Sequence, residues 1–491
     1  MIEGCTARKQ FQPLDHFRNV QSTYSLLPLR FISLDETRYL LTNFAGEYCA
    51  LPRETLHSFL RGTLPIQSPE YGRLKSKQFL IDDESSATLE LLAAKYRTKQ
   101  EYLTDFTRLH IIVPTLRCNN RCGYCQVSRQ GPSSSGYDMT TEIAERAVEF
   151  TFRSPARRLK VEFQGGEPLL QFPLVRYIVE TSLERSQAQS RYVEFVICTN
   201  LSLLDDDILE FCAAHEVYFS TSLDGPKALH NLNRPNPDFD CYDRTISGIS
   251  RVREALGRDN ISALMTTTRA SLSQPVAIVD EYLRQGFNSM FVRPINPYGL
   301  AARTGDAGGY TADEWLTFYK EVLSYILELN YQGISFRESY AALVLQKILT
   351  PYSTGFVDLQ SPAGVGIGVI AFNHDGSVYP SDESRMLAEM GDNRFRLGNL
   401  LTDTYEQIML SEKLISLVKD TMTEGMPQCC DCGVQPYCGS DPVRHYRTQG
   451  DLVGYKPTSE FCARNMAIIK HLIWLLETDP KASEVLKTWI S

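Results

Sequence analysis

Hydrophobic and polar positions alternate between strand-like and helix-like segments from residue 109 to residue 300. Short runs rich in β-branched and aromatic residues predict strands at 109–115, 159–166, 193–200, 217–225, 261–268 and 290–297. Apolar residues at helical spacing predict helices at 140–154, 205–215, 245–257 and 276–286. Six β/α units in succession predict a parallel sheet with helices outside, and so an α/β fold built on a complete or partial (β/α)6 barrel.

The segment before the barrel has a different pattern. Strand-like runs lie at 24–34, 37–44 and 47–52, and helix-like runs follow at 53–62, 68–80 and 82–90. We therefore expect a small α+β module over residues 1–100, with the barrel over residues 101–333.

The chain after residue 334 is less regular. Residues 364–380 predict a hairpin that turns at Asp375–Gly376. A second group of cysteines follows within residues 426–442, and Cys462 stands apart from it. We expect residues 334–491 to form a third domain.

Composition narrows the functional classes. A chain of 491 residues suggests two to four domains, and a formal charge of −9 argues against a nucleic-acid partner. The N-terminus lacks the apolar run of a secretory signal, and the apolar stretch 466–478 is short and carries Lys470 and His471. These features predict a cytoplasmic protein without a membrane span. In that compartment 13 cysteines favour metal binding or chemistry over structural disulfides.

Three of the cysteines, Cys118, Cys122 and Cys125, form a C-x₃-C-x₂-C pattern directly after the first barrel strand. Three thiolates are one short of the four ligands that a tetrahedral zinc ion or a cubane iron–sulfur cluster requires. A zinc site with a remote fourth ligand, or three unrelated core cysteines, are the alternatives. The next strand ends at the same mouth of the barrel with backbone groups and a carboxylate that suit an ammonium group, in Gly165, Gly166, Glu167 and Pro168.

The two motifs together, C-x₃-C-x-aromatic-C and GGEP, resemble the radical S-adenosylmethionine (SAM) superfamily. The resemblance implies that the three thiolates bind three irons of a [4Fe–4S] cluster, and that the amino and carboxylate groups of SAM chelate the fourth. Tyr124 would lie over this cluster and shield it. Further residues implied to surround SAM are Thr199 and Asn200 after the third strand, Ser222 after the fourth, and Arg234. For Arg234 a solvated loop arginine is the alternative.

The C-terminal cysteines Cys429, Cys432, Cys438 and Cys462 suit either a structural zinc ion or an iron–sulfur cluster. Beside a radical SAM barrel they resemble the SPASM extension, which carries seven cysteines for two auxiliary clusters. The positions expected to hold ligands of the first auxiliary cluster are Ala363, Ser381 and Pro442. The resemblance therefore implies one auxiliary [4Fe–4S] cluster kept and one lost.

The remaining cysteines are interpreted as ordinary residues. Cys198 and Cys212 fit apolar faces as small core side chains, and Cys430 is adjacent to Cys429, which hinders it from reaching the same cluster. Cys5, Cys49 and Cys241 carry no motif.

Over the whole chain the sequence is most similar to the maturases of His-Xaa-Ser peptide systems. The segments that carry this resemblance are residues 26–31, 40–48, 372–392 and 437–451. It implies a ribosomal precursor peptide as substrate, and a crosslink from the ring of the first residue to Cβ of the third. It also implies that the winged-helix-like N-terminal module binds the leader by β-augmentation, and that flavodoxin or ferredoxin donates electrons.

Other functions remain open at this point. They are peptide epimerisation or Cα ether or thioether formation, sulfatase-type formylglycine maturation, and a non-catalytic iron–sulfur protein that binds a leader. Asp382 and Glu383, which follow Ser381, are candidates for the base that accepts the final proton. The alternative is that both are solvated hairpin residues that pair with Arg385.

Overall fold

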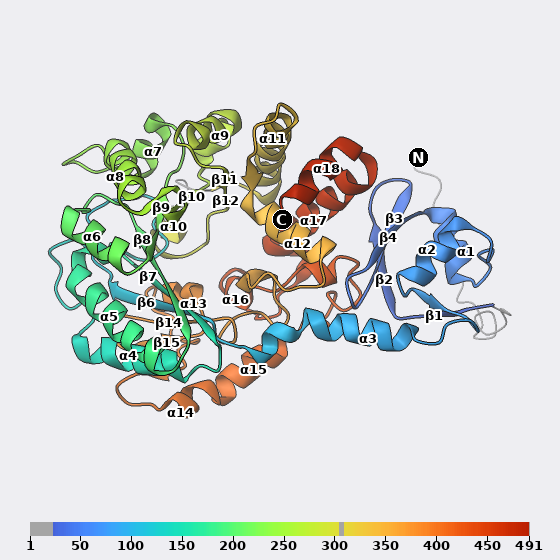
Figure 1. The fold of residues 1–491 in the computed structure, drawn as a ribbon, viewed down its shortest axis with the longest axis horizontal. Helices are drawn as coiled ribbons and strands as arrows, with labels where there is room; N and C mark the ends of the chain where they lie inside the picture. Colours follow the sequence, from blue (N-terminus) through green and yellow to red (C-terminus); the bar gives the residue numbers. More distant parts are fainter. Residues whose placement is uncertain (1–22, 304–308, 491) are drawn as a thin grey trace, which may run out of the picture. The chain divides into compact units, whose positions relative to one another are not determined.

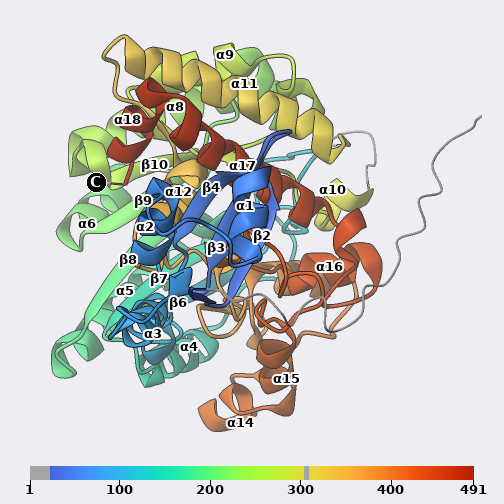
Figure 2. The same cartoon turned by 90° about the vertical axis from the view of Figure 1, so that its right-hand side faces the viewer.

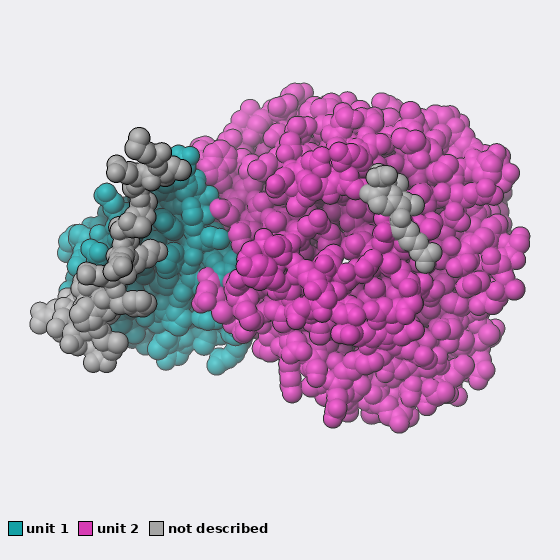
Figure 3. Space-filling model, turned by 180° about the vertical axis from the view of Figure 1, so that it is seen from behind, with its two compact units in different colours: residues 1–98, 432–436 teal, residues 99–431, 437–491 magenta. Residues whose placement is uncertain are grey.

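The computed structural model describes residues 23–303 and 309–490 (Figure 1). Two compact units share the chain: one runs to residue 98 and includes residues 432–436, and the other comprises residues 99–431 and 437–491. Figure 3 shows them in teal and magenta. The start of the expected 1–100 module and Cys5 lie outside the described residues.

The first unit is a small antiparallel sheet with helices. Its strands are β2 (Leu29–Ser33), β3 (Arg38–Asn43) and β4 (Tyr48–Pro52), paired in that order, and β1 (Ser25–Leu26) pairs separately with β5 (Leu80–Ile81). The helices are α1 (Arg53–Leu60), α2 (Pro69–Ser76) and α3 (Thr88–Lys99). Leu41, Cys49 and Phe59 are fully buried in the core that this sheet forms with its helices.

The second unit contains the barrel that the sequence predicts. Parallel strands β6 (Leu109–Thr115), β7 (Arg158–Gly165), β8 (Tyr192–Thr199), β9 (Val217–Ser222), β10 (Ile261–Thr266) and β12 (Val292–Arg293) lie side by side in chain order. The α/β barrel fold is therefore confirmed. Because the sheet is parallel, the carboxyl ends of these strands meet at one mouth.

Helices cover the outer face of this sheet. They are α4 (Thr141–Arg153), α5 (Phe172–Ala188), α6 (Asp206–Ala214), α7 (Lys227–Asn233), α8 (Cys241–Leu256) and α9 (Pro275–Arg284) (Figure 1). The main hydrophobic core lies between the sheet and these helices, where Phe163, Phe195 and Phe219 from neighbouring strands are buried. The opposite face of the strands surrounds the barrel interior, and it carries more polar side chains.

The C-terminal part extends the same sheet. Strand β14 (Val369–Phe372) pairs in parallel with β6, and β15 (Ser377–Tyr379) and β16 (Gly398–Asn399) continue it antiparallel. The β14–β15 hairpin turns through Asp375 and Gly376, as the sequence predicts, and Gly376 adopts a left-handed φ of 81°. The sequence did not predict that β14 joins the barrel sheet.

The remaining elements of this unit are mostly helical. They are α10 (Gly299–Arg303), α11 (Ala312–Tyr331), α12 (Ser339–Leu349), α13 (Asp382–Ala388), α14 (Tyr405–Met409), α15 (Glu412–Asp420), α16 (Pro442–Gln449), α17 (Glu460–Thr478) and α18 (Pro480–Thr488), with the strand pair β11 (Ser289–Met290) and β13 (Arg337–Glu338). Helices α11, α17 and α18 pack against one another (Figure 2). In the part of the chain that the structure describes, no helix has the length and apolar character needed to cross a bilayer.

Candidate functional site

The loop after β6 brings the three cysteines of the first motif to one cavity. Cys118, Cys122 and Cys125 all line a cavity of about 260 Å³ at the mouth of the barrel. Burial raises the pKa of the Cys122 thiol to about 11, and the charge of Arg234 opposes this rise. A buried thiol becomes a thiolate most readily when a positively charged group replaces its proton.

The end of β7 approaches the cysteine loop so closely that side chains are excluded there. A Cβ on Gly165, which has a φ of 122°, would lie 2.3 Å from the backbone oxygen of Thr115. A Cβ on Gly166 would lie 2.0 Å from the backbone oxygen of Arg117. The backbone N–H of Gly166 donates to Thr115 O at 2.9 Å, and that of Glu167 donates to Arg117 O at 2.7 Å. The glycines therefore bring the exposed backbone of β7 to the cavity beside Cys118.

The Glu167 carboxylate has a different role from the one that the sequence suggested. It is 1% exposed and accepts hydrogen bonds from Thr199 Oγ1 at 2.6 Å and from the Asn200 backbone N–H at 2.9 Å. The Leu169 N–H also donates to it at 3.1 Å. These bonds tie the ends of β7 and β8 together, and the binding of an ammonium group at this strand end stays a prediction.

A buried network holds the cysteine loop against the end of β9. The Tyr124 hydroxyl donates to Asp224 Oδ2 at 2.7 Å, and Arg234 donates from Nε to the same oxygen at 2.9 Å. The Arg234 guanidinium also lies over the Tyr124 ring, 5.3 Å from its centroid. Arg234 lines the cavity, yet its pairing with the fully buried Asp224 makes it part of the scaffold. It is not the solvated loop arginine that was the alternative.

The barrel interior adds polar groups that the sequence pattern did not single out. Cys198 Sγ donates to Glu162 Oε1 at 3.2 Å, and Gln164 Nε2 donates to the same oxygen at 2.6 Å. Glu162, Gln164 and Cys198 all line the cavity together with Asn200 and Ser222. The interpretation of Cys198 as a core side chain was wrong, because it points into the barrel.

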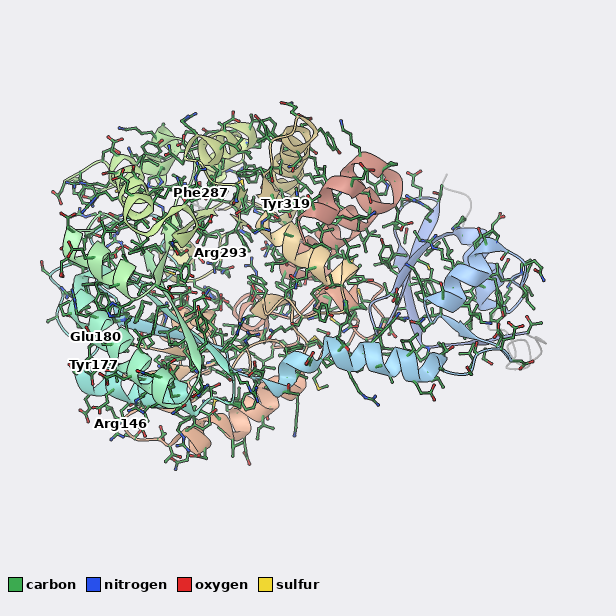
Figure 4. All side chains as sticks on the ribbon, in the orientation of Figure 1. Arg146, Tyr177, Glu180, Phe287, Arg293 and Tyr319 are labelled. Atoms are coloured by element: carbon green, nitrogen blue, oxygen red, sulfur yellow. The ribbon has the colours of Figure 1, made fainter. Side chains whose placement is uncertain are left out.

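A second, larger cavity of about 370 Å³ adjoins the first. Gln164, Leu264, Arg293 and Asp382 line both, so the two cavities meet at these residues. Figure 4 shows Arg293 among the side chains inside the barrel and Arg146 on its outer helix layer.

The carboxylates Asp382 and Glu383 are placed in this second cavity. Asp382 is 7% exposed, begins α13 and pairs with the fully buried Arg385 at 2.7 Å. Burial raises the pKa of Glu383, and the neighbouring Asp382 and Asp441 raise it further. The interpretation of this pair as solvated hairpin residues was wrong, although the predicted pairing with Arg385 is present.

The three positions that lack a predicted ligand of the first auxiliary cluster have structural roles. Ser381 is the N-cap of α13 and accepts a hydrogen bond from the Ser384 N–H at 3.2 Å. Pro442 occupies the first turn of α16, behind the N-cap Asp441, and Ala363 is fully buried. Protein side chains therefore occupy these positions, and Asp382 beside Ser381 and Asp441 beside Pro442 line the second cavity.

The cysteines predicted to bind the other auxiliary cluster are divided between the units. Cys429, Cys438 and Cys462 belong to the second unit and Cys432 to the first. Among the described residues, no group of three His, Cys, Asp or Glu side chains is arranged to hold a single metal ion. A cubane binds each thiolate through a different iron, so this finding concerns single ions, and both predicted cluster ligand sets remain predictions.

Comparison with known proteins identifies the family of the barrel domain. Residues 112–269 match the model of the Radical SAM superfamily, so the chain contains a radical SAM domain. The chain is also similar in sequence to a cysteine-type anaerobic sulfatase-maturating enzyme of Clostridium perfringens. The two are 24% identical over 311 residues, which cover 62% of this chain and 80% of that protein.

Two solved structures share the fold. Native anSMEcpe with bound AdoMet (SAM) superposes with a TM-score of 0.63 at 18% identity, covering 77% of this chain and 99% of that one. Streptococcus suis SuiB bound to its precursor peptide SuiA has a TM-score of 0.52 at 15% identity, covering 89% of this chain and 99% of that one. The resemblance to His-Xaa-Ser maturases in particular stays a prediction.

A radical SAM domain implies a [4Fe–4S] cluster and SAM, and the residues at the first cavity fit them. Cys118, Cys122 and Cys125 offer three thiolates to one space, and Gly165 and Gly166, which let β7 pack closely against the cysteine loop, line the same space. Asn200, Ser222 and the backbone of residues 165–167 line the same cavity and would surround SAM.

Anaerobically reconstituted protein is expected to bind about eight irons, four in each cubane. A Cys118→Ala/Cys122→Ala/Cys125→Ala variant should keep about half of them, because only the first cluster loses its ligands. Iron and acid-labile sulfide assays measure both. About twelve irons would mean that ligands other than cysteine hold the first auxiliary cluster, and zinc at the C-terminal site would leave only the first cluster's iron.

Proposed function

We propose that the protein is a maturase that modifies a ribosomally synthesised peptide by forming a carbon–carbon crosslink at a His-x-Ser-like motif. The observation that carries this proposal is the junction of the two cavities at Gln164, Arg293 and Asp382. A side chain held in the larger cavity would present its carbon atoms to the smaller one, where the cysteines lie. Two solved structures with this fold contain bound peptides: SuiB binds the precursor peptide SuiA, and anSMEcpe binds the Cp18Cys peptide.

When bound, SAM and the cluster at Cys118, Cys122 and Cys125 would supply a radical that takes one hydrogen atom from a substrate carbon, and the auxiliary cluster would serve as an electron acceptor. The crosslink removes two hydrogens in all, so a group of the protein must take the second as a proton. The protein's part is to hold the peptide, to accept the proton and to exclude water. An external electron donor such as flavodoxin or ferredoxin would reduce the cluster, and one auxiliary cluster held by Cys429, Cys432, Cys438 and Cys462 is part of the proposal.

Coexpression with a short peptide that carries His-x-Ser repeats tests the proposal. Mass spectrometry is expected to show the loss of two hydrogens from the peptide, and fragmentation should place the link between the first and third residues of the motif. An unchanged mass with deuterium uptake from D₂O would indicate epimerisation instead. An unmodified peptide, under conditions in which the enzyme cleaves SAM, would contradict the proposal.

Formylglycine maturation is the second candidate, because the Clostridium perfringens relative is a sulfatase-maturating enzyme. Coexpression with a cysteine-containing sulfatase peptide, followed by mass spectrometry, distinguishes formylglycine maturation from crosslinking. Conversion of that cysteine to an aldehyde would favour this candidate, and hydrazide labelling detects the aldehyde.

Glu383 and Asp382 are proposed as the groups that accept the released proton. Glu383→Gln is expected to keep making 5′-deoxyadenosine while the ratio of crosslinked peptide to 5′-deoxyadenosine falls by about 10²-fold or more, since a missing base typically costs this much. Asp382→Asn should act in the same direction, and it also removes the charge that pairs with Arg385. Glu412→Gln is the matched control, because Glu412 is an exposed glutamate in the first turn of α15. Wild-type ratios in both variants would show that neither carboxylate is the base.

The N-terminal module is proposed to bind the leader of the precursor. Its β4 pairs with β3 on one side, and a leader strand added to an edge of this sheet would gain main-chain hydrogen bonds. Deletion of residues 1–100 is expected to weaken binding of a fluorescein-labelled leader, measured by anisotropy, while leaving uncoupled SAM cleavage largely intact. If the truncated and full-length proteins bind the leader with equal affinity, the module does not bind the leader.

A further inference from the structure

The larger cavity has one aromatic wall and one acidic wall. Phe291, Tyr340 and Phe356 form the aromatic wall, with ring centroids 5.7 to 5.9 Å apart. Asp358, Glu383 and Asp441 line the same cavity. Flat π faces next to carboxylates are the surroundings that favour an organic cation with an apolar stem.

The three carboxylates lie close enough to oppose one another's ionisation. Burial raises the pKa of Asp358, and the charges of Glu383 and Asp441 raise it further. Asp358 accepts no side-chain hydrogen bond from any residue that the structure describes. A cation placed among these groups would relieve this repulsion.

The arginines of the cavity offset this acidic wall only in part: the charges of Arg293 and Arg444 lower the pKa of Asp358, against the rise caused by burial and the other carboxylates. Arg444 is bonded through Nη1 to Asn296 Oδ1 at 2.9 Å and through Nη2 to Glu460 at 3.1 Å. Arg464 lies 3.5 Å from the same Glu460 carboxylate, whose side chain is half exposed. Arg293 approaches Glu383 only to 3.9 Å. Two of the three positive charges are therefore already shared with a carboxylate outside the acidic wall.

A neutral group in the lining also lacks a partner. Asn465 is 5% exposed, and its Oδ1 accepts a hydrogen bond from the Tyr340 hydroxyl at 2.6 Å. Its Nδ2 donates to no group in the described part of the chain. A buried N–H without an acceptor costs about 1–3 kcal/mol, so this position favours a ligand that carries an acceptor oxygen.

We propose that this cavity binds a basic side chain of the substrate peptide. The cationic head lies between Asp358 and Asp441, its stem lies on the rings of Phe291 and Phe356, and Asn465 Nδ2 donates to a peptide carbonyl oxygen beside it. The assignment to a peptide rests on the proposed function, whereas the preference for a cation rests on the cavity itself.

Three small probes of equal size test the charge preference: benzamidinium, benzamide and benzoate. Each offers the same ring with a positive, neutral or negative head. Binding is measured by saturation-transfer NMR and calorimetry on the reconstituted holoenzyme with saturating SAM, which keeps the probes out of the first cavity. Benzamidinium is expected to bind roughly tenfold more tightly than benzamide, as a hydrogen-bonded ion pair should, and benzoate should bind least.

Asp441→Asn is the decisive variant. Asparagine caps a helix as well as aspartate does, so α16 keeps its N-cap while the cavity loses a charge. The preference for benzamidinium over benzamide should fall by roughly tenfold in this variant and also in Asp358→Asn, and should be unchanged in Glu412→Gln.

Equal binding of benzamidinium and benzamide, or tightest binding of benzoate, would overturn the cation site. So would an unchanged preference in both aspartate variants. If the preference is found but no peptide is modified in the coexpression assay, the cation site stands and the assignment to a peptide fails. If peptides are modified without any such preference, the proposed function stands and this inference fails.

Discussion

Replacement of Cys118, Cys122 or Cys125 by alanine is expected to abolish SAM cleavage. Each thiolate is predicted to bind a different iron, so the loss of one leaves a cluster that is not held at the cavity. The measurement is the yield of 5′-deoxyadenosine from SAM under anaerobic reduction with dithionite. The yield should fall to background in all three variants.

The matched control is Cys430→Ala, which removes a partly exposed cysteine outside both predicted ligand sets. This variant should cleave SAM at the wild-type rate. Wild-type yields from any one of the three variants of the first motif would contradict the assignment of those cysteines as cluster ligands.

Asp224→Ala is expected to have the largest effect on stability. Asp224 is fully buried and pairs with Arg234, whose side chain is 11% exposed, so the variant leaves a buried guanidinium without its counter-charge. Breaking a buried ion pair in this way typically costs about 3–5 kcal/mol. The Tyr124 hydroxyl also loses its acceptor, so the cysteine loop should be less ordered and iron incorporation lower.

Thermal unfolding of the cluster-free proteins, compared side by side, measures the stability effect, and iron content after reconstitution measures the effect on the loop. Asp243→Ala is the control, because Asp243 pairs with Lys227 at the surface, where both side chains are more than half exposed. Such a pair contributes at most about 1 kcal/mol. Similar midpoints for the two variants would show that the network around Asp224 does not hold the loop.

The barrel was predictable because its signal is local. Each strand is a short apolar run, each helix has a period near 3.6, and their alternation leaves few topologies for a parallel sheet. The pairing of β14 with β6 was not predictable in this way. The paired residues Val369 and Leu109 are far apart in the sequence. Nothing in the local pattern of either segment specifies that partner.

The candidate site was predictable where spacing carries the information. The cysteine triplet and the two glycines of β7 can be identified from sequence alone, since their spacing is unusual for core residues. Glu162 and Cys198 could not be identified as site residues in this way, because the sequence does not show which face of their strands points into the barrel. Asp224 lies two residues after the predicted site residue Ser222, but its buried pairing with Arg234 could be identified only from the folded structure.

The caps at Ser381 and Asp441–Pro442 would make the predicted loss of the first auxiliary cluster hard to reverse in evolution. A single return to cysteine at Ser381 would remove a helix cap, at a cost of about 1 kcal/mol, and would bind nothing without its partners. Ala363 is fully buried, and a larger side chain there would have to fit into a close-packed interior. A first step toward a cluster is therefore disfavoured at each position, and homologues that share these residues are expected to keep packing and capping residues there.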